Sequence, residues 1–397
     1  MSKRATTIWT FVVVSVAVFM ASLDNLIVTT ALPVIKMELG ATLQQLQWTV
    51  NAYTLTFAVL LLSGAALGDR FGRKRVFMIG IGIFTAGSVL AALAPSAGVL
   101  IMARAVQGLG GAIVTPLTLT ILSAAVAPAQ RGLALGVWSA VGCLAIAIAP
   151  VVGGAIVESF SWQWVFWVNV PIGLALLPIA WLRIEETTGP DRALDLPGVA
   201  FASSALFGIV WGLVRSDSQG WTSLEVAGSM AAGVLLLALF VWWEARSRTP
   251  MVPMHFFRRR SFSTANATSM LMSFGMFGSV FLLAQFFQIV QGLSPFQAGL
   301  RTLTWTAMPI LVAPLAGLLS DRIGSRPLLV TGMGMMAGGL AWIAAVASPT
   351  VPYHDLVPPF AIAGIGMSLS FAPVANVVLS AVRREEEGKA SGVSNTV

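Results

Sequence analysis

The sequence predicts an all-α membrane protein, and three observations lead to that prediction. Only 10% of its 397 residues are charged, whereas a soluble domain carries about 25%. Hydrophobic residues make up 57% of the chain, and the mean hydropathy is +0.85. Apolar stretches of roughly 20 residues, the length that a helix needs to cross a bilayer core, recur along the sequence. Most of the surface is therefore expected to face lipid.

Twelve apolar stretches are bounded by charges, glycines or prolines, and each is expected to form one transmembrane helix. The first follows Lys3 and Arg4, as a signal peptide would. It is longer than the apolar core of a signal and ends without a small-residue cleavage site, so we expect it to be retained. The stretches cover approximately residues 8–33, 47–68, 76–94, 97–124, 132–156, 164–182, 195–214, 224–243, 263–290, 297–319, 327–347 and 356–379.

Lysine and arginine residues alternate between the loops. Of the 23, 19 fall on one side, Lys36, Arg215 and Arg301 fall on the other, and Arg104 lies inside a stretch. Because cytoplasmic loops carry the basic excess, both termini of this chain are predicted to be cytoplasmic, in a multi-pass protein of the cell membrane. The basic residues recur at every second loop instead of gathering on one face of a polar fold. Nucleic acid is therefore not an expected partner.

Enzymatic functions are poorly supported. No phosphate-binding loop, serine-hydrolase elbow or zinc-protease motif occurs. The single cysteine, Cys143, and the two histidines, His255 and His354, are too few for a His/Cys metal site. We expect neither a metal nor a cofactor, and no catalytic residues.

An internal repeat is the most informative feature of the sequence. LGDRFGRKR from Leu67 matches LSDRIGSRP from Leu319, 252 residues later. Two further pairs agree at an offset of 256: QGLGGAIVTP with AGIGMSLSFAP, and RGLALGV with EGKASGV. The offset equals eight of the expected helices, and an even displacement gives parallel repeats, as in transporter halves related by an axis along the membrane normal.

The repeat predicts two pseudo-symmetric halves with two extra helices between them. Residues 1–188 would form a six-helix bundle, 189–250 the two linker helices, and 251–397 four of the six helices of the second bundle. The complete pattern would need fourteen helices, two more than the expected twelve.

The chain resembles the fourteen-span drug:proton antiporter family of the major facilitator superfamily over nearly its whole length. It departs from the common pattern at Ala149, where glycine is frequent, and at Gln163, where arginine is common. The resemblance implies a major facilitator bundle that exports drugs or other amphipathic small molecules by alternating access, with protons as the coupling ion. The motifs that carry it are LDNLIVTTALP, WTVNAY, GDRFGRKR, RAVQGLGGA, APVVGG, SWQWVFWVNVPIG, LDLPG and QGLSPFQAG.

Asp24 and Arg104 are the charged residues placed well inside apolar stretches. At 1.5 Å per residue, Arg104 lies about 10 Å and Asp24 about 13 Å from the outer ends of their stretches, so the two side chains can pair. Intramembrane charges are expensive and mark functional sites. Asp24 is a candidate for binding a proton or the charge of a substrate, with a structural hydrogen-bonding role as the alternative. For Arg104 the alternatives are a structural charge or, as the resemblance implies, a role in proton transfer.

A cytoplasmic position explains the basic residues of the repeated turn, but it does not explain the aspartate and the glycine of the turn. The glycine permits a tight path, and the carboxylate can pair with arginines or lie at a helix N-terminus. The resemblance implies a conformational latch between the halves. The candidate residues are Asp69, Arg70, Gly72, Arg73, Asp321, Arg322 and Gly324.

Pro150, Gly153 and Gly154 interrupt the fifth stretch. Small residues let helices approach closely, so plain packing explains them, whereas the resemblance implies an antiporter motif. Six neutral polar residues inside stretches are candidates for lining a cavity or for hydrogen bonds between helices: Asn51, Tyr53, Gln107, Gln285, Gln288 and Asn376. Three tryptophans are expected at the membrane interface: Trp162, Trp164 and Trp167.

Two alternatives to drug export remain open. The same cycle could export an endogenous metabolite, or the chain could be a membrane fragment that does not transport, because its second half lacks two helices. The expected partners are the lipid bilayer and a small amphipathic molecule, and the expected form is a monomer.

Overall fold

The computed structural model describes residues 3–127, 131–189, 195–247, 250, 252–382, 390 and 393–394. Within these residues the chain is helical and forms no strand, which confirms the predicted fold class. The helices are α1 (Lys3–Leu39), α2 (Leu43–Phe71), α3 (Arg73–Ala92), α4 (Ala97–Ala125), α5 (Arg131–Ser159), α6 (Trp164–Trp167), α7 (Asn169–Arg183), α8 (Leu196–Gln219), α9 (Leu224–Glu244), η2 (Met254–Arg258), α10 (Arg260–Gln285), η3 (Phe286–Val290), α11 (Pro295–Thr306), α12 (Met308–Ile323), α13 (Ser325–Val346) and α14 (Tyr353–Ser380).

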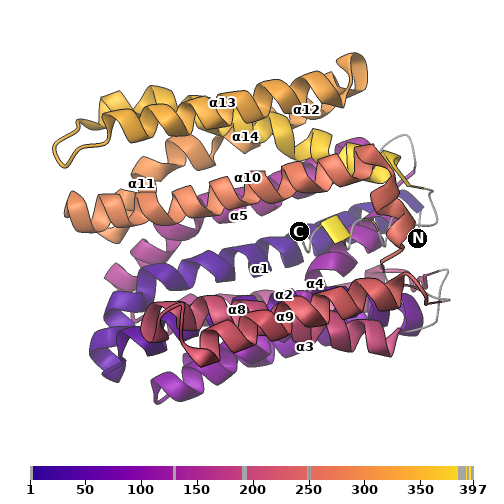
Figure 1. Ribbon diagram of the computed structural model, residues 1–397, viewed down its shortest axis with the longest axis horizontal. Coiled ribbons are helices and arrows are strands. Elements are labelled where there is room, and N and C mark those ends of the chain that lie inside the picture. The colour runs from indigo at the N-terminus through magenta and orange to yellow at the C-terminus, as the bar shows by residue number, and fades with distance from the viewer. Residues whose placement is uncertain are drawn as a thin grey trace.

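The long helices lie side by side in two groups, with α10 to α14 on one side of the molecule and α1 to α4, α8 and α9 on the other (Figure 1). Helix α5 packs against α1 and also against α11 and α12, so it joins the two groups. Ten helices in the described part of the chain are long and apolar enough to cross a membrane, or eleven with α2. The expectation of twelve therefore exceeds the observed number. Helix α10 is not among them, and its first half is rich in serine, threonine and asparagine.

One expected helix is bent, and two others have a local interruption in their hydrogen bonding, which the apolar pattern did not indicate. Helix α2 bends by 49° between Leu61 and Ser63. The sixth expected helix is divided into α6 and α7 at Val168. The tenth is divided into α11 and α12 at Ala307, two residues before Pro309, which lacks the N–H that would continue the helical ladder.

Glycines set the distances between neighbouring helices. A Cβ at Gly64 would lie 2.8 Å from the Cα of Ile113 in α4, and one at Gly110 would lie 2.7 Å from the Cα of Phe84 in α3. Contacts with backbone atoms at such distances leave no room for a side chain. Helices α2 and α3 therefore both pack tightly on α4, through the small residues that drive helix association in lipid.

The expected linker helices, α8 and α9, form a hairpin that lies against the first group. The hydroxyl of Ser203 in α8 donates to the carbonyl of Val59 in α2 at 3.0 Å. The rings of Trp48 and Trp211 lie 5.2 Å apart between the same two helices. The hairpin is thus attached to α2.

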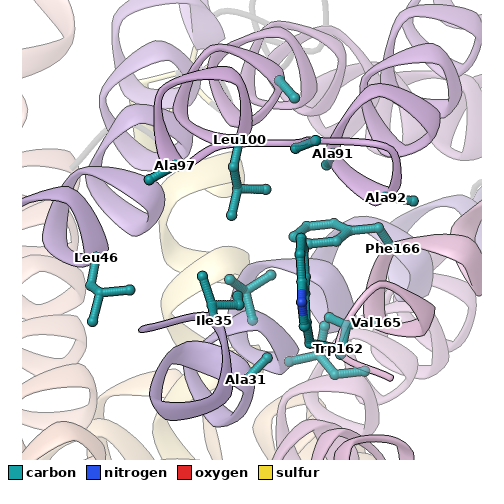
Figure 2. Packing of buried hydrophobic residues seen from close by; sticks show 14 of the residues in the cluster. Ala31, Ile35, Leu46, Ala91, Ala92, Ala97, Leu100, Trp162, Val165 and Phe166 are labelled. Atoms are coloured by element: carbon teal, nitrogen blue, oxygen red, sulfur yellow. The ribbon is translucent and has the colours of Figure 1, made fainter. Parts of the chain in front are cut away.

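An apolar cluster fills one end of the first group, between α1, α3, α4 and α6 (Figure 2). Trp162 and Phe166 lie in it with their rings edge to face, 6.2 Å apart. Trp162 is fully buried in this cluster, whereas Trp164 is 51% exposed. The expected position of the tryptophans at the membrane interface stays a prediction. Trp162 is buried because its indole N–H donates to Glu38 Oε2 at 2.9 Å, which satisfies its polar atom.

Replacing Trp162 by phenylalanine is expected to lower the free energy of unfolding by about 1–2 kcal/mol, because it removes this hydrogen bond and leaves a void beside Phe166. Thermal unfolding of the purified protein in detergent measures the effect. The same substitution at the exposed Trp164 is the control and should change the melting temperature little. Equal shifts in the two variants would contradict the assigned contact.

Candidate functional site

The carboxylate of Asp24 lies at the centre of a buried polar cluster formed by α1, α4 and α7. Its Oδ2 pairs with Nη1 of Arg104. Its Oδ1 accepts from the amide of Gln107 at 3.1 Å and from the amide of Asn169 at 2.6 Å. All four side chains are at most 1% exposed. The structure thus brings together the two charges that were expected to share a depth in the membrane.

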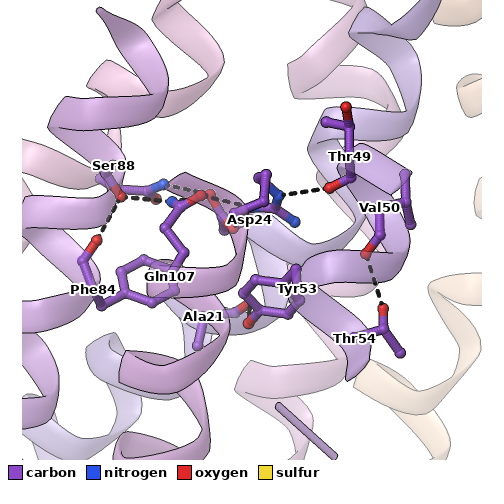
Figure 3. Close-up of polar contacts among 11 residues, drawn as sticks. Ala21, Asp24, Thr49, Val50, Tyr53, Thr54, Phe84, Ser88 and Gln107 are labelled. Carbon is purple, nitrogen blue, oxygen red and sulfur yellow. Dashed lines mark hydrogen bonds and ion pairs between the residues drawn. The ribbon is translucent and has the colours of Figure 1, made fainter. Parts of the chain in front are cut away.

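Arg104 is held from several sides. Its Nε donates to the carbonyl of Thr49 at 3.3 Å, and its Nη1 also donates to Oε1 of Gln107 at 2.9 Å. The guanidinium lies over the ring of Tyr53, 4.4 Å from its centroid, in a cation–π contact that strengthens where water is excluded. Tyr53 and Thr49 belong to α2, so the guanidinium connects α2 to the cluster (Figure 3).

One carboxylate holds three helices together in this cluster. Asp24 accepts from three donors, and a carboxylate has acceptor oxygens for all of them. A proton on the carboxylate removes the partner charge of Arg104 and weakens the bonds from Gln107 and Asn169. Since these partners lie on α4 and α7, protonation would loosen α1 from two helices at once. The carboxylate of Asp24 therefore links the packing of three helices, and its role in proton coupling stays a prediction.

Two members of the network were missed in the sequence. Asn169 begins α7 and binds Asp24, and Ser88 of α3 accepts from Gln107 Nε2 at 2.8 Å. Ser88 in turn donates to the carbonyl of Phe84 at 2.9 Å. An asparagine inside an apolar stretch was a usable signal. A serine was not, because serines in transmembrane helices commonly bond to their own backbone.

The first copy of the repeated turn is braced by the segment that follows α7. Arg73 Nε pairs with Asp69 at 2.7 Å. The backbone N–H of Arg73 donates to Thr187 O at 2.8 Å, and that of Gly189 donates to Asp69 O at 3.0 Å. Glu186 accepts from the first backbone N–H groups of α3, that of Lys74 at 2.9 Å among them. The carboxylate thus caps α3, because the N-cap residue of this helix, Gly72, has no side chain that could do so.

The second copy repeats the backbone of this turn. Gly72 has φ 105° and Gly324 has φ 84°, and both donate their N–H to the carbonyl four residues earlier at 3.0 Å. Arg70 lies over the ring of Phe71, and Arg322 is exposed. The side chain of Asp321 lies outside the described part of the structure. The observed contacts of the first copy stay within the first group and the segment after α7, and the latch between halves stays a prediction.

Replacing Gly72 by alanine is expected to destabilise the protein more than the same change at Gly324. Both positions have a positive φ that strains an alanine by about 1–3 kcal/mol. Only at Gly72 would the new Cβ also meet the carboxyl carbon of Glu186, at 2.7 Å, whereas it meets no described atom within 4 Å at Gly324. Thermal unfolding of the two variants gives the difference. An equal loss in both would show that Glu186 does not restrain the turn.

The three motif residues of α5 contact two different helices. A Cβ at Gly153 would meet Thr30 Oγ1 of α1, and one at Gly154 would lie 2.9 Å from the backbone N of Phe296 in α11. Pro150 lies opposite Gly299 of α11, where an added Cβ would be 3.0 Å from the proline Cβ. The motif therefore lies at the joint between the two groups of helices. A role in setting the direction of transport stays a prediction.

The six candidates for lining a cavity are scattered. Tyr53 and Gln107 are buried around the charge pair inside the first group. Gln285 is exposed, and the remaining three, Asn51, Gln288 and Asn376, are half-buried. None of the six lines the small apolar cavity between the groups, to which α1, α5, α10, α11 and α14 contribute. No group of three or more histidine, cysteine, aspartate or glutamate side chains that could hold a metal occurs in the described residues.

One group of helices buries a charge pair, and glycines bring this group into close contact with the second one. This arrangement is that of a transport protein built from two helical bundles. Residues 14–397 match the family described as Major Facilitator Superfamily, and the chain belongs to that family. This confirms the resemblance found in the sequence. The chain is therefore a multi-span helical membrane protein, with the lipid bilayer and small molecules as its partners.

Two relatives and one solved structure are similar along nearly the whole chain. Multidrug resistance protein Stp of Mycobacterium tuberculosis is 35% identical over 390 residues, and the match covers 98% of this chain and 72% of that protein. The tetracenomycin C resistance and export protein of Streptomyces glaucescens is 34% identical over 391 residues, with the same coverage. The proton:xylose symporter XylE shares the fold, with a TM-score of 0.67, 14% identity, and coverage of 100% of this chain and 86% of that one.

Proposed function

We propose that the protein is a proton-driven secondary transporter that exports drugs or other amphipathic small molecules by alternating access. The observation that supports it most is the buried Asp24–Arg104 pair, whose contacts with three helices tie the charge state of one carboxylate to helix packing. The relatives named for drug resistance and export favour a drug as the substrate. Protons would be the coupling ion, and no cofactor or catalysis is part of the proposal.

The proposed cycle alternates the protonation of Asp24 with the rocking of two halves about the α5–α11 joint. A proton that enters from outside neutralises Asp24, loosens α1, and is released to the cytoplasm when Arg104 pairs with the carboxylate again. One proton gains about 2.3 kcal/mol per 100 mV of membrane potential and about 1.4 kcal/mol per pH unit. If one proton is exchanged per substrate, 100 mV and one pH unit together sustain a concentration ratio of about 500 for an uncharged substrate.

The proposal also covers the orientation in the membrane, the oligomeric state and the units that move. Both termini of this chain would be cytoplasmic, in the plasma membrane, and the protein would act as a monomer. The moving units would be residues 1–188 and 251–397, and the α8–α9 hairpin would travel with the first unit because it is attached to α2.

Transport by the purified protein in liposomes tests the function. With a pH gradient imposed across the membrane, a lipophilic fluorescent dye is expected to move against its concentration gradient while protons move the opposite way, reported by a second, pH-sensitive dye. Nigericin, which collapses the gradient, should stop both. Dye movement that ignores the gradient would contradict proton coupling. A screen of metabolites in the same liposomes separates drug export from export of an endogenous compound.

A further inference from the structure

The guanidinium of Arg301 is held at the junction of η3, α11 and α14. Its Nη1 donates to Oε1 of Gln291 at 2.7 Å, and Gln291 is itself held, because its Nε2 donates to Val351 O at 3.2 Å. The guanidinium carbon lies 5.8 Å from the ring centroid of Phe287 and 5.3 Å from that of Tyr353. Both distances are in the range of a cation–π contact. The orientation of this cation is therefore set before any ligand binds.

The backbone at Arg301 is fixed as well. The hydroxyl of Tyr353 donates to the carbonyl of Arg301 at 2.8 Å and is hydrogen-bonded to Oγ1 of Thr304 at 2.6 Å. These bonds attach the first residue of α14 to α11. The cation thus has both a fixed direction and a fixed position.

One edge of the guanidinium has no partner. Its Nε and Nη2 donate to no atom of the described residues, and neither atom is enclosed by protein. No acid in the described part of the chain pairs with Arg301. The acid that follows Tyr353 in α14, Asp355, pairs with His354 at 3.4 Å. Nε and Nη2 therefore form an open fork, the arrangement that donates two parallel hydrogen bonds to the oxygens of a phosphate or a carboxylate.

The helix face that carries Arg301 continues into an exposed apolar stripe. Steps of three or four residues, which stay on one face of a helix, lead from Arg301 through Thr304 to Leu311, Leu315 and Leu318. The three leucines are 67%, 63% and 62% exposed, and they belong to a segment that is long and apolar enough to cross a membrane. Such leucines face lipid chains. From Arg301 to Leu311 the helix rises about 15 Å, half of a hydrocarbon core and hence the depth of one leaflet.

We propose that Arg301 binds the phosphate group of a phospholipid whose acyl chains lie along Leu311, Leu315 and Leu318. An anionic headgroup such as that of phosphatidylglycerol fits best, because a zwitterionic headgroup brings a cation of its own next to the guanidinium. The leucine stripe favours a lipid over a soluble phosphate, since it continues the fork on the surface that acyl chains cover. This site goes beyond the proposed function and does not depend on whether the protein transports.

Three compounds separate the parts of this ligand. Dioleoyl-phosphatidylglycerol has the phosphate and the chains, dioleoylglycerol has the chains alone, and glycerol 3-phosphate lacks the chains. Each is titrated into the protein purified in detergent, and the rise in melting temperature with concentration gives an apparent dissociation constant. We expect the phospholipid to bind about tenfold more tightly than dioleoylglycerol, the gain of charged hydrogen bonds. Glycerol 3-phosphate should have no effect at the same concentrations. In Arg301→Gln the two lipids should bind alike.

Arg215→Gln is the matched control, because both variants remove one positive charge. The guanidinium of Arg215 also lies over an aromatic ring, that of Trp211, at 5.2 Å. It pairs with Glu225 at 3.2 Å, however, so its charge is already balanced. This variant should keep the preference for the phospholipid.

Four results would overturn the inference. Equal affinities for the two lipids in the unaltered protein would remove the role of the phosphate, and this comparison needs no variant to fold. A preference that survives in Arg301→Gln, or that Arg215→Gln removes to the same extent, would show attraction by overall charge instead of a site at Arg301. Glycerol 3-phosphate that binds as tightly as the phospholipid would make the ligand a soluble phosphate.

Discussion

Asp24→Asn is expected to abolish proton-coupled efflux and to lower the free energy of unfolding by about 3–5 kcal/mol. Asparagine keeps the shape of the side chain and can still accept a hydrogen bond from Asn169. It removes the charge opposite Arg104, which is 0% exposed and pairs with no other acid in the described part of the chain. Efflux from liposomes under a pH gradient and thermal unfolding in detergent measure the two effects.

A double variant separates coupling from stability. Asp24→Asn combined with Arg104→Gln removes both charges, so we expect the melting temperature to recover while proton coupling stays lost. Glu38→Gln is the matched control on the same helix, because glutamine can still accept from Trp162 Nε1, and it should transport normally. If the double variant regains proton-coupled efflux along with its stability, Asp24 has only a structural role.

Gly154→Ala is expected to slow transport by about tenfold or more, the effect of roughly 1.4 kcal/mol or more in overpacking. The added methyl group would lie 2.9 Å from both the N and the Cα of Phe296. These are backbone atoms, so the clash is relieved only if α11 moves away from α5. Because this contact joins the two groups of helices, a shift there would alter the balance between their orientations. The initial rate of dye transport at saturating substrate measures it.

Gly142→Ala serves as the control for Gly154→Ala, since both glycines lie in α5. A Cβ at Gly142 would have no described atom within 4 Å, and alanine favours a helix over glycine. We therefore expect unchanged transport and equal or greater stability. If the two alanine variants transport equally well, the close contact between α5 and α11 does not limit the cycle.

The fold class and the charge pair could be predicted from the sequence because both follow from the expense of polar groups in lipid. Apolar stretches of about 20 residues predict transmembrane helices, and the two charges deep inside such stretches were placed at a similar depth, where they could pair, as Asp24 and Arg104 do. Asn169 and Ser88, which complete the cluster, were not found. Neutral polar residues are inexpensive enough to occur in many transmembrane helices, so their spacing alone does not select the functional ones.

The helix breaks and the position of Trp162 could not be read from hydropathy. A break at Ala307 depends on a local backbone hydrogen bond that Pro309 cannot form, and hydropathy averages over many residues. Trp162 is buried because Glu38, 124 residues away in the sequence, accepts its N–H. A contact between such distant residues leaves no periodic signal. The buried cluster of Met272, Met276, Met336 and Met367 leaves no such signal either.

Gly72 and Gly324 have the same backbone conformation, and this similarity indicates how the two halves of the chain are related. Both glycines turn the same corner, while their surroundings differ: Glu186 crowds the first, and the second has no described neighbour. Inheritance from one ancestral bundle accounts for the shared corner, which only glycine adopts without strain. In the described part of the chain the brace from residues 186–189 holds only the first of the two corners, so one inherited turn serves in two different surroundings.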